Sequence, residues 1–269
     1  MISKAVILAA GMGSRLCPLT PFLPKEMLPI NGFPALHHVL REVADAGVRQ
    51  VFTVLSEGKE CIVDYLTNRI SPKGDSAVAL SLKRERLLLD LRFEFTWQKE
   101  LRGTADAIAL ARDFMGEDPA LVIYPDDLLS VEDGVRDGVY ALRKICKVSI
   151  SSGKSVLLVR EIPCSLASSY GVVTLGEENA GGAYSVLDIV EKPRIYTPDR
   201  AFAMMGRFVI GPTVTERIPD LPLTDREGIV PALREEAKEG RLLAVVYNGV
   251  HEDIGSHDGY AHACKRFLT

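Results

Sequence analysis

The sequence predicts an α/β fold in which a mainly parallel sheet is covered by helices on both faces. Short apolar runs typical of buried strands alternate with helical patterns through the first half of the chain. The second half is richer in strands and turns, and no proline- or serine-rich linker separates it from the first. With 47% hydrophobic and 25% charged residues among 269, the composition is that of a globular protein and excludes disorder for most of the chain.

The first half is predicted to alternate strands and helices. Ala5–Ala9 is an apolar run bounded by Gly11, which favours a buried strand. Apolar side chains then recur every three to four residues over Leu36–Val43, one face of a helix that Gly47 would end. The other elements expected here are strands at Val51–Leu55, Phe93–Thr96 and Ala120–Tyr124, and helices at Cys61–Leu66, Thr104–Phe114 (with Thr104 as N-cap) and Val131–Cys146.

The second half is expected to continue the same sheet rather than form a separate domain. A charged helix is expected at Glu227–Glu239, and the polar stretch Ser71–Arg86 of the first half is expected to be an exposed loop. The strands predicted here are Ser155–Arg160, Gly171–Leu175, Ser185–Val190, Gly206–Ile210 and Leu242–Tyr247. In an open parallel sheet, ligands bind beyond the carboxyl ends of the strands, so the residues directly after them are the functional candidates.

The composition also bears on partners and location. Lysine and arginine total 32 and aspartate and glutamate 36, so the net charge is −4 and does not favour nucleic acid, which needs a basic surface. The five cysteines are far apart, which is typical of reduced thiols in the cytoplasm. No stretch approaches the roughly 20 apolar residues of a membrane span, and the chain starts with a strand rather than a signal peptide.

A glycine-rich loop with two cations follows the first predicted strand. Gly11 and Gly13 allow backbone N–H groups to approach a phosphate closely. Arg15 and Lys25 add positive charge to the same connection. Leu16 stands where a dinucleotide-binding loop has its third glycine, so the loop does not favour a dehydrogenase. A tight turn with solvated cations is the alternative interpretation.

Two acidic residues are candidate ligands for a divalent cation. Asp126 comes directly after the predicted strand Ala120–Tyr124, and Asp253 precedes Gly255 near the C-terminus. Magnesium prefers oxygen ligands, often one or two carboxylates completed by substrate phosphates. A helix cap or a turn is the alternative interpretation of each acid. The metal site therefore requires that the fold bring these two distant residues together.

Two further strand ends carry polar side chains. Gln98 follows the third predicted strand, and its amide suits the edge of a base, while Gly103 lets the backbone approach closely. Glu191 and Lys192 end a later strand and offer an acceptor and a cation. Surface solvation is the alternative interpretation of this charged pair.

Taken in order from Lys4 to about Ala263, these motifs resemble the sugar-1-phosphate nucleotidyltransferases, and most closely the bacterial UTP–glucose-1-phosphate uridylyltransferases. Lys4–Leu16 resembles the N-terminal nucleotide loop of that family, and Pro24–Ile30 is close to the form of its uridylyltransferase branch. The remaining matches are Gln98, Gly103, Tyr124-Pro-Asp126, Tyr170-Gly-Val-Val173, Val190-Glu-Lys-Pro193, Gly206-Arg-Phe-Val209 and Asp253-Ile-Gly255.

The resemblance implies a fold and a reaction. The fold is a Rossmann-like three-layer α/β/α sandwich with a mixed, mainly parallel central sheet, as in nucleotide-diphospho-sugar transferases. A single domain over 1–269 would hold a nucleotide-binding half in 1–130 and a sugar-phosphate-binding half in 131–269. The reaction joins UTP and glucose 1-phosphate, with Mg²⁺ as cofactor, into UDP-glucose and pyrophosphate. Assembly into a homo-oligomer stays open, because little of the chain follows the last motif.

The resemblance also implies a role for each candidate residue. Arg15 and Lys25 are implied to be catalytic, and Asp126 and Asp253 to hold the metal. The nucleotide is implied to contact Ala10, Gly11, Gly13, Gln98 and Gly103, and the sugar phosphate Gly171, Glu191 and Lys192.

Two alternatives accompany this interpretation. Within the enzyme class, the alternative substrates are dTTP or another nucleoside triphosphate, and another sugar 1-phosphate; the stretch Arg102–Asp106 is nearer to the form of the adenylyl and guanylyl branches. A regulatory paralog that binds nucleotide sugars without catalysis is the alternative from another class. Such a paralog should lack one of the site's cations or acids, whereas this chain keeps all of them.

Overall fold

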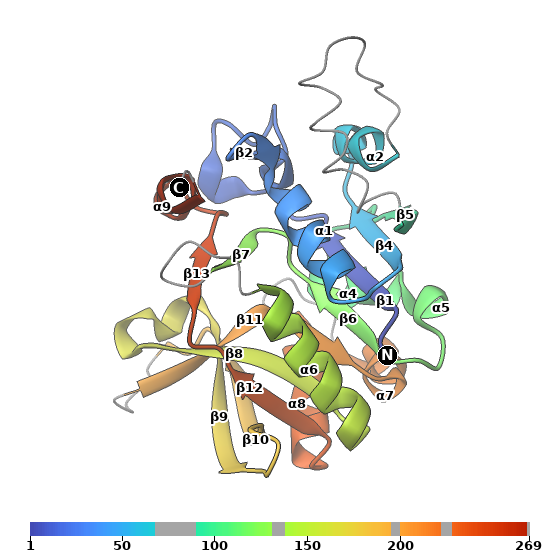
Figure 1. Ribbon diagram of the computed structural model, residues 1–269, viewed down its shortest axis with the longest axis vertical. Coiled ribbons are helices and arrows are strands. Elements are labelled where there is room, and N and C mark those ends of the chain that lie inside the picture. The colour runs from blue at the N-terminus through green and yellow to red at the C-terminus, as the bar shows by residue number, and fades with distance from the viewer. Residues whose placement is uncertain (68–89, 131–137, 195–199, 222–227, 268–269) are drawn as a thin grey trace.

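The computed structural model (Figure 1) describes residues 1–67, 90–130, 138–194, 200–221 and 228–267. The stretch expected to be an exposed loop, Ser71–Arg86, and the first part of the helix expected at Val131–Cys146 lie outside the described residues. Among the helices that are described, none is long and apolar enough to cross a membrane.

A nine-stranded mixed sheet forms the centre of the molecule. In sheet order its strands are β5 (Arg92–Trp97), β4 (Gln50–Leu55), β1 (Lys4–Ala9), β6 (Ala120–Ile123), β11 (Arg200–Ile210), β8 (Ser155–Pro163), β12 (Leu242–Val246), β10 (Tyr184–Glu191) and β9 (Gly171–Glu178). The first four strands pair in parallel, and so do β8 and β12. The other pairings are antiparallel, beginning with β11 beside β6 and β8. The one sheet therefore continues from the first half of the chain into the second.

Helices cover both faces of this sheet, so the predicted three-layer sandwich is confirmed (Figure 1). Side chains alternate between the faces of a strand, and on β1 Ile7 packs into one core while Val6 packs into the other. The helices on the Ile7 side are α1 (Ala35–Asp45), α2 (Glu60–Leu66) and α6 (Gly138–Ser152). Those on the Val6 side are α4 (Gly103–Ala109), α5 (Arg112–Met115), α7 (Pro212–Arg217) and α8 (Val230–Lys238).

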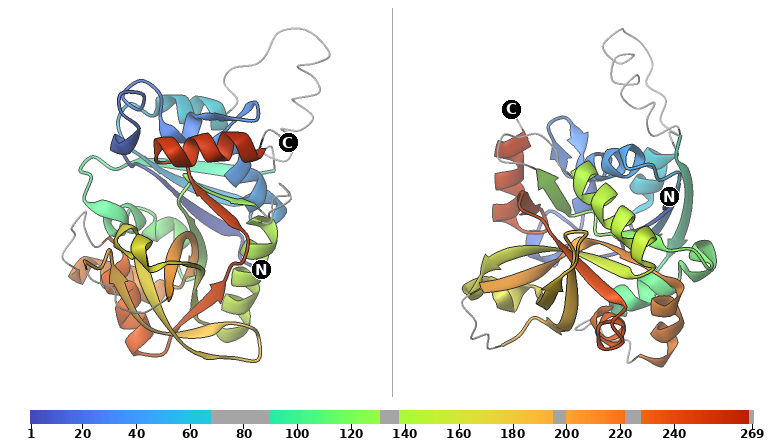
Figure 2. Two further views of the ribbon diagram at one scale, coloured as in Figure 1. Left: turned by 90° about the vertical axis from the view of Figure 1, so that its left-hand side faces the viewer. Right: turned by 60° about the horizontal axis from the view of Figure 1, so that its bottom comes forward.

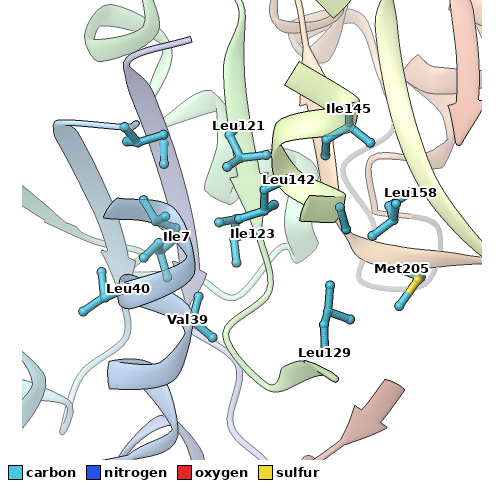
Figure 3. Close-up of a cluster of buried hydrophobic side chains, with 14 of the residues drawn as sticks. Ile7, Val39, Leu40, Leu121, Ile123, Leu129, Leu142, Ile145, Leu158 and Met205 are labelled. Atoms are coloured by element: carbon cyan, nitrogen blue, oxygen red, sulfur yellow. The ribbon is translucent and has the colours of Figure 1, made fainter. Parts of the chain in front are cut away.

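The larger core shows why the alternating pattern folds this way. Val39 and Leu40 of α1 and Leu142 of α6 lie over Ile7 and Ile123 of the parallel strands (Figure 3). All five side chains are fully buried. Burying an aliphatic side chain of this size stabilises the fold by roughly 1.5–3 kcal/mol relative to leaving it exposed. Packing the apolar face of the helices against these strands therefore stabilises both kinds of element.

The helix expected at Thr104–Phe114 is in fact two helices. The chain leaves helical geometry between α4 and α5, where Leu110 is 42% exposed and Ala111 is fully buried. The interruption lets α5 turn Met115 into the core. The prediction of Thr104 as N-cap is wrong, because Arg102 holds that position and the Thr104 hydroxyl instead accepts a hydrogen bond from the Ile229 N–H at 3.1 Å.

A short antiparallel ribbon of β7 (Asp127–Ser130) and β13 (Val250–Asp253) was not predicted. Figure 2 shows β13 leading into α9 (His257–Phe267), which contacts the hairpin of β2 (Pro29–Ile30) and β3 (Phe33–Pro34). The hydroxyl of Tyr260 donates to the Pro29 carbonyl at 3.0 Å. Further short elements are the 3₁₀ turns η1 (Ser14–Leu16), η2 (Lys25–Met27), η3 (Cys164–Ser169) and η4 (Ile218–Asp220). The ribbon returns the end of the chain to the carboxyl edge of the parallel strands.

Candidate active site

Topology brings the two candidate metal ligands together. Asp126 lies in the turn between β6 and β7, and the register of the ribbon places Asp253 opposite Asp127. The N–H of Ile254 donates to the Asp126 carbonyl at 2.9 Å, which fixes the end of β13 to this turn. The two acids are 127 positions apart in the sequence, so only this ribbon makes them neighbours.

The two candidate cations pair with these two acids. Arg15 lies 2.9 Å from Asp253, measured from Nη1 to Oδ2, and the Lys25 ammonium contacts the Asp126 carboxylate. Gly255 lies among them. A Cβ atom at Gly255 would lie 2.8 Å from Nη2 of Arg15 and 2.8 Å from Oδ1 of Asp253. It would lie 3.1 Å from Oδ2 of Asp126, so a side chain here would displace charged groups.

The charges of both carboxylates, Asp126 and Asp253, favour the protonated forms of Arg15 and Lys25 and raise the pKa of each cation. Burial lowers the pKa of Lys25, but the negative charges of Asp126 and Glu26 outweigh it and leave the pKa above its usual value. Burial likewise opposes the charge of Arg15, and Asp253 outweighs it and raises that pKa. Lys25 is therefore an ammonium at neutral pH even though only 14% of its side chain is exposed.

The two carboxylates fit a divalent cation that is completed by a substrate. Asp126 Oδ2 and Asp253 Oδ1 both face the backbone of Gly255, which leaves room because it has no side chain. In the described part of the chain, no group of three histidine, cysteine or acidic side chains could hold a metal. A pair of carboxylates alone suits magnesium, which usually retains waters and binds substrate phosphates as further ligands.

The glycine-rich loop borders this cluster. Gly13 has a φ of +67°, a backbone conformation that favours glycine, and its carbonyl accepts a hydrogen bond from the Thr20 hydroxyl at 2.9 Å. Ala10 is buried and Gly11 is exposed. A Cβ atom at Gly11 would lie 3.6 Å from the Lys25 Nζ, so the loop and this cation are neighbours.

A buried ion pair beneath the loop was not recognised from the sequence. The Lys59 Nζ lies 3.0 and 2.9 Å from the two carboxylate oxygens of Glu26, and both side chains are buried. Burial opposes the ionisation of both groups, raising the pKa of Glu26 and lowering that of Lys59. Glu26 is the residue after Lys25, but no local pattern marks Lys59, 33 positions further on.

Gln98 is buried and oriented by two acceptors. Its side-chain amide N–H₂ donates to the Gly103 carbonyl at 3.1 Å and to the Asp106 carboxylate at 2.8 Å. Since both partners only accept hydrogen bonds, the amide nitrogen must face them and the amide oxygen is left for another donor. Gly103 has a φ of +85°, and Arg102 pairs with Asp106 at 3.1 Å. The geometry thus presents an acceptor at the end of β5.

The sugar-phosphate candidates form a third group at the ends of β9 and β10. Gly171 pairs with Glu191 across the sheet, and a Cβ atom at Gly171 would lie 2.9 Å from the Glu191 Oε2. Lys192 pairs with Glu191 at 3.1 Å and has a φ of +44°. Its backbone N–H donates to the Tyr170 carbonyl at 3.0 Å.

The structure therefore joins four of the predicted residues directly, places the glycine-rich loop beside them, and leaves the Gln98 and Glu191 groups separate. Within the described ranges, no hydrogen bond or ion pair links the Gln98 or Glu191 groups to the four charges. Burial raises the pKa of Tyr124; a hydrogen bond to Thr104 opposes this, while the charges of Glu191, Asp127 and Asp126 add to it. We did not single out the Tyr124 side chain from the sequence.

Arg207, from the motif that follows the sugar-phosphate motifs, holds the turn that carries Asp126. Its side chain is completely buried and donates to the Tyr124 carbonyl at 2.9 Å and to the Asp127 carbonyl at 2.7 Å. Glu42 of α1 balances its charge at 3.2 Å. The two carbonyls flank the turn, so this guanidinium fixes both of its ends.

With this geometry in view, we compared the chain with known proteins. The Nucleotidyl transferase family matches residues 4–269. The chain belongs to this family. A relative from Pseudomonas aeruginosa named UTP–glucose-1-phosphate uridylyltransferase is 31% identical, over 98% of this chain and 95% of its own length. One from Staphylococcus haemolyticus with the same name is 30% identical, over 96% of this chain and 90% of its own.

Solved structures give the same relationship for this nucleotidyl transferase. A UDP-glucose pyrophosphorylase complexed with UDP-glucose superposes with a TM-score of 0.86 at 29% identity, covering 99% of this chain and 98% of that one. The UTP-bound enzyme from Acinetobacter baumannii gives a TM-score of 0.81 at 25% identity, over 99% and 93% of the two chains. The resemblance and the fold class inferred from the sequence are thus both confirmed.

Proposed function

We propose that this nucleotidyl transferase makes UDP-glucose and pyrophosphate from UTP and glucose 1-phosphate. The observation that carries the proposal is the cluster of two cations and two carboxylates around Gly255. Relatives that share nearly the whole chain are named for this reaction, and one similar structure holds UDP-glucose.

The chemistry needs positioning and charge rather than a proton acceptor. An oxygen of the sugar phosphate is already anionic and attacks the α-phosphorus of the triphosphate in line, while pyrophosphate leaves. The difficulty is to bring two polyanions together and to stabilise the charge of the transition state. In this proposal Arg15 braces the triphosphate and the leaving pyrophosphate, and Lys25 neutralises the reacting phosphate.

The ion pairs of the free protein support such a role by partner exchange. Arg15 and Lys25 balance Asp253 and Asp126 before substrates arrive. Asp126 and Asp253 would hold a Mg²⁺ ion, which would supply positive charge to stabilise the phosphate charge that develops in the reaction. With their aspartates engaged in this way, Arg15 and Lys25 would be available to phosphate oxygens of the substrates.

The remaining candidate residues would hold the two substrates. Gln98, with the backbone of Ala10, Gly11, Gly13 and Gly103, contacts the nucleotide in the half spanning 1–130. In the half spanning 131–269, Lys192 binds the sugar phosphate, Glu191 accepts hydrogen bonds from sugar hydroxyls, and Gly171 leaves room for the ring. We propose that the two halves work as one domain. The proposal includes a cytoplasmic location, with which the five free cysteines agree.

A substrate panel with magnesium tests this function. Pyrophosphate release is measured with UTP, dTTP, ATP and GTP, each combined with glucose 1-phosphate and with other sugar 1-phosphates. The proposal predicts the highest kcat/KM for UTP with glucose 1-phosphate. A preference for another triphosphate would correct the base. Tight binding of UDP-glucose without pyrophosphate formation would instead favour a regulatory paralog.

A further inference from the structure

The Lys59 side chain contacts three segments of the site: the end of β1, the glycine-rich loop and η2. Its Nζ lies 2.5 Å from the Ala9 carbonyl at the end of β1 and 2.8 Å from the Gly11 carbonyl in the glycine-rich loop. The same ammonium lies 2.9 and 3.0 Å from the carboxylate oxygens of Glu26 in η2, next to Lys25. Only 7% of the Lys59 side chain is exposed, so these contacts take place out of water.

The two carbonyl contacts determine where the loop's donors face. In a trans peptide the C=O and the following N–H point in opposite directions. The carbonyls of Ala9 and Gly11 face Lys59, so the N–H groups of Ala10 and Met12 face away from it. Among the residues that the structure describes, no acceptor is found for either N–H. The loop therefore presents two free donors on its side away from Lys59.

An ion pair that only stabilised the fold would not need the Lys59 ammonium to contact the loop carbonyls as well as Glu26. A buried ion pair is often no more stabilising than apolar side chains of the same volume, because desolvation offsets the attraction. Here the ammonium is shared between the carboxylate and two loop carbonyls, while its partner Glu26 adjoins Lys25. The pair therefore links the orientation of the loop to the position of that cation.

We infer that Lys59, balanced by Glu26, is a positioning residue that holds the glycine-rich loop with its Ala10 and Met12 N–H groups toward the triphosphate. This inference rests on the proposed function, because it assigns the loop to the nucleotide. Lys59 touches no substrate and acts only through the backbone. Its loss should weaken the UTP interaction and leave the sugar-phosphate interaction nearly unchanged.

Two variants separate positioning from stability. Lys59→Met keeps the length of the side chain but removes its donors, and leaves the Glu26 charge buried. The double variant Lys59→Met/Glu26→Met removes both charges and tests the loop even if the single variant folds poorly. The surface pair of Lys238 and Glu235, 2.7 Å apart on α8, gives the matched control Lys238→Met/Glu235→Met.

The experiment measures UTP binding by calorimetry, KM for each substrate by pyrophosphate release, and thermal stability. We expect the double variant to melt near the wild type but to bind UTP roughly 10–100-fold more weakly, as is usual when a supporting partner is removed. Its KM for glucose 1-phosphate should change less than about threefold, which is below 1 kcal/mol. The control should match the wild type in every measurement.

Two results would overturn the inference in distinguishable ways. If the double variant binds UTP as tightly as the wild type, Lys59 supports only the fold and the inference fails while the proposed function stands. If the wild-type protein itself does not bind UTP, the proposed function fails and the inference falls with it.

Discussion

Lys25 and Asp126 are two charged residues of the proposed site whose roles can be tested one at a time. Each is mostly buried and each is the charge partner of the other in the free protein. Replacing either by alanine should lower kcat by roughly 10²–10³, the typical cost of removing a preorganised charge. Pyrophosphate release with saturating substrates measures this, and Lys238→Ala is the surface control. Near-wild-type turnover in a folded Lys25→Ala or Asp126→Ala variant would refute the role of that residue.

A substitution at Gly255 tests whether activity depends on the close packing of charged groups around this residue, because it removes no charge. A methyl group here would lie 2.8 Å from Nη2 of Arg15 and from Oδ1 of Asp253, so those groups must move. We expect Gly255→Ala to lower kcat by roughly 100-fold, since displacement of about 1 Å is enough for such a loss. Gly211→Ala is the matched control, because a Cβ atom there meets no atom within 4 Å. Equal activity of both variants would contradict the proposed geometry.

At the scale of elements, a buried arginine supports the turn between β6 and β7. Removing one partner of a buried ion pair costs about 3–5 kcal/mol, because the other charge is left uncompensated. We therefore expect Arg207→Met to lower the free energy of unfolding by that amount, because the buried Glu42 carboxylate then loses the guanidinium that balances its charge. Urea denaturation measures the change. The double variant Arg207→Met/Glu42→Met should recover the part caused by the unbalanced carboxylate, but not the part caused by the lost hydrogen bonds to the Tyr124 and Asp127 carbonyls. A loss below about 1 kcal/mol in the single variant would show that the pair is solvated.

The elements that could be predicted are those whose pattern is local. The apolar run that forms β1 and the helical stripe of α1 are visible within a few residues. The β7–β13 ribbon could not be predicted, because each strand has only four residues and its pairing joins distant parts of the chain. The sequence motifs therefore identified Asp126 and Asp253 as candidates, but only the ribbon in the structure shows that the two residues are close in space. The contacts of Lys59 were missed for the same reason.

At the scale of the whole molecule, the site combines residues from the beginning, middle and end of the sequence, and the proposed function requires a divalent cation. Chelation with EDTA should abolish pyrophosphate release, because without a metal Asp126 and Asp253 remain paired with Lys25 and Arg15. Excess magnesium should restore the activity. Circular dichroism should not change on chelation, since buried apolar side chains hold the sheet together. Full turnover after exhaustive chelation would remove the metal from the proposed mechanism.

The most direct test is to locate the metal in a complex. Crystals of the protein with UDP-glucose and Mn²⁺, a substitute for Mg²⁺ that scatters anomalously, would show the ion as a peak in an anomalous map. We predict one peak in contact with the carboxylates of Asp126 and Asp253 and with a phosphate of the ligand, with Arg15 and Lys25 turned toward phosphate oxygens. A peak away from these two aspartates, with both ion pairs intact beside the bound ligand, would contradict the account.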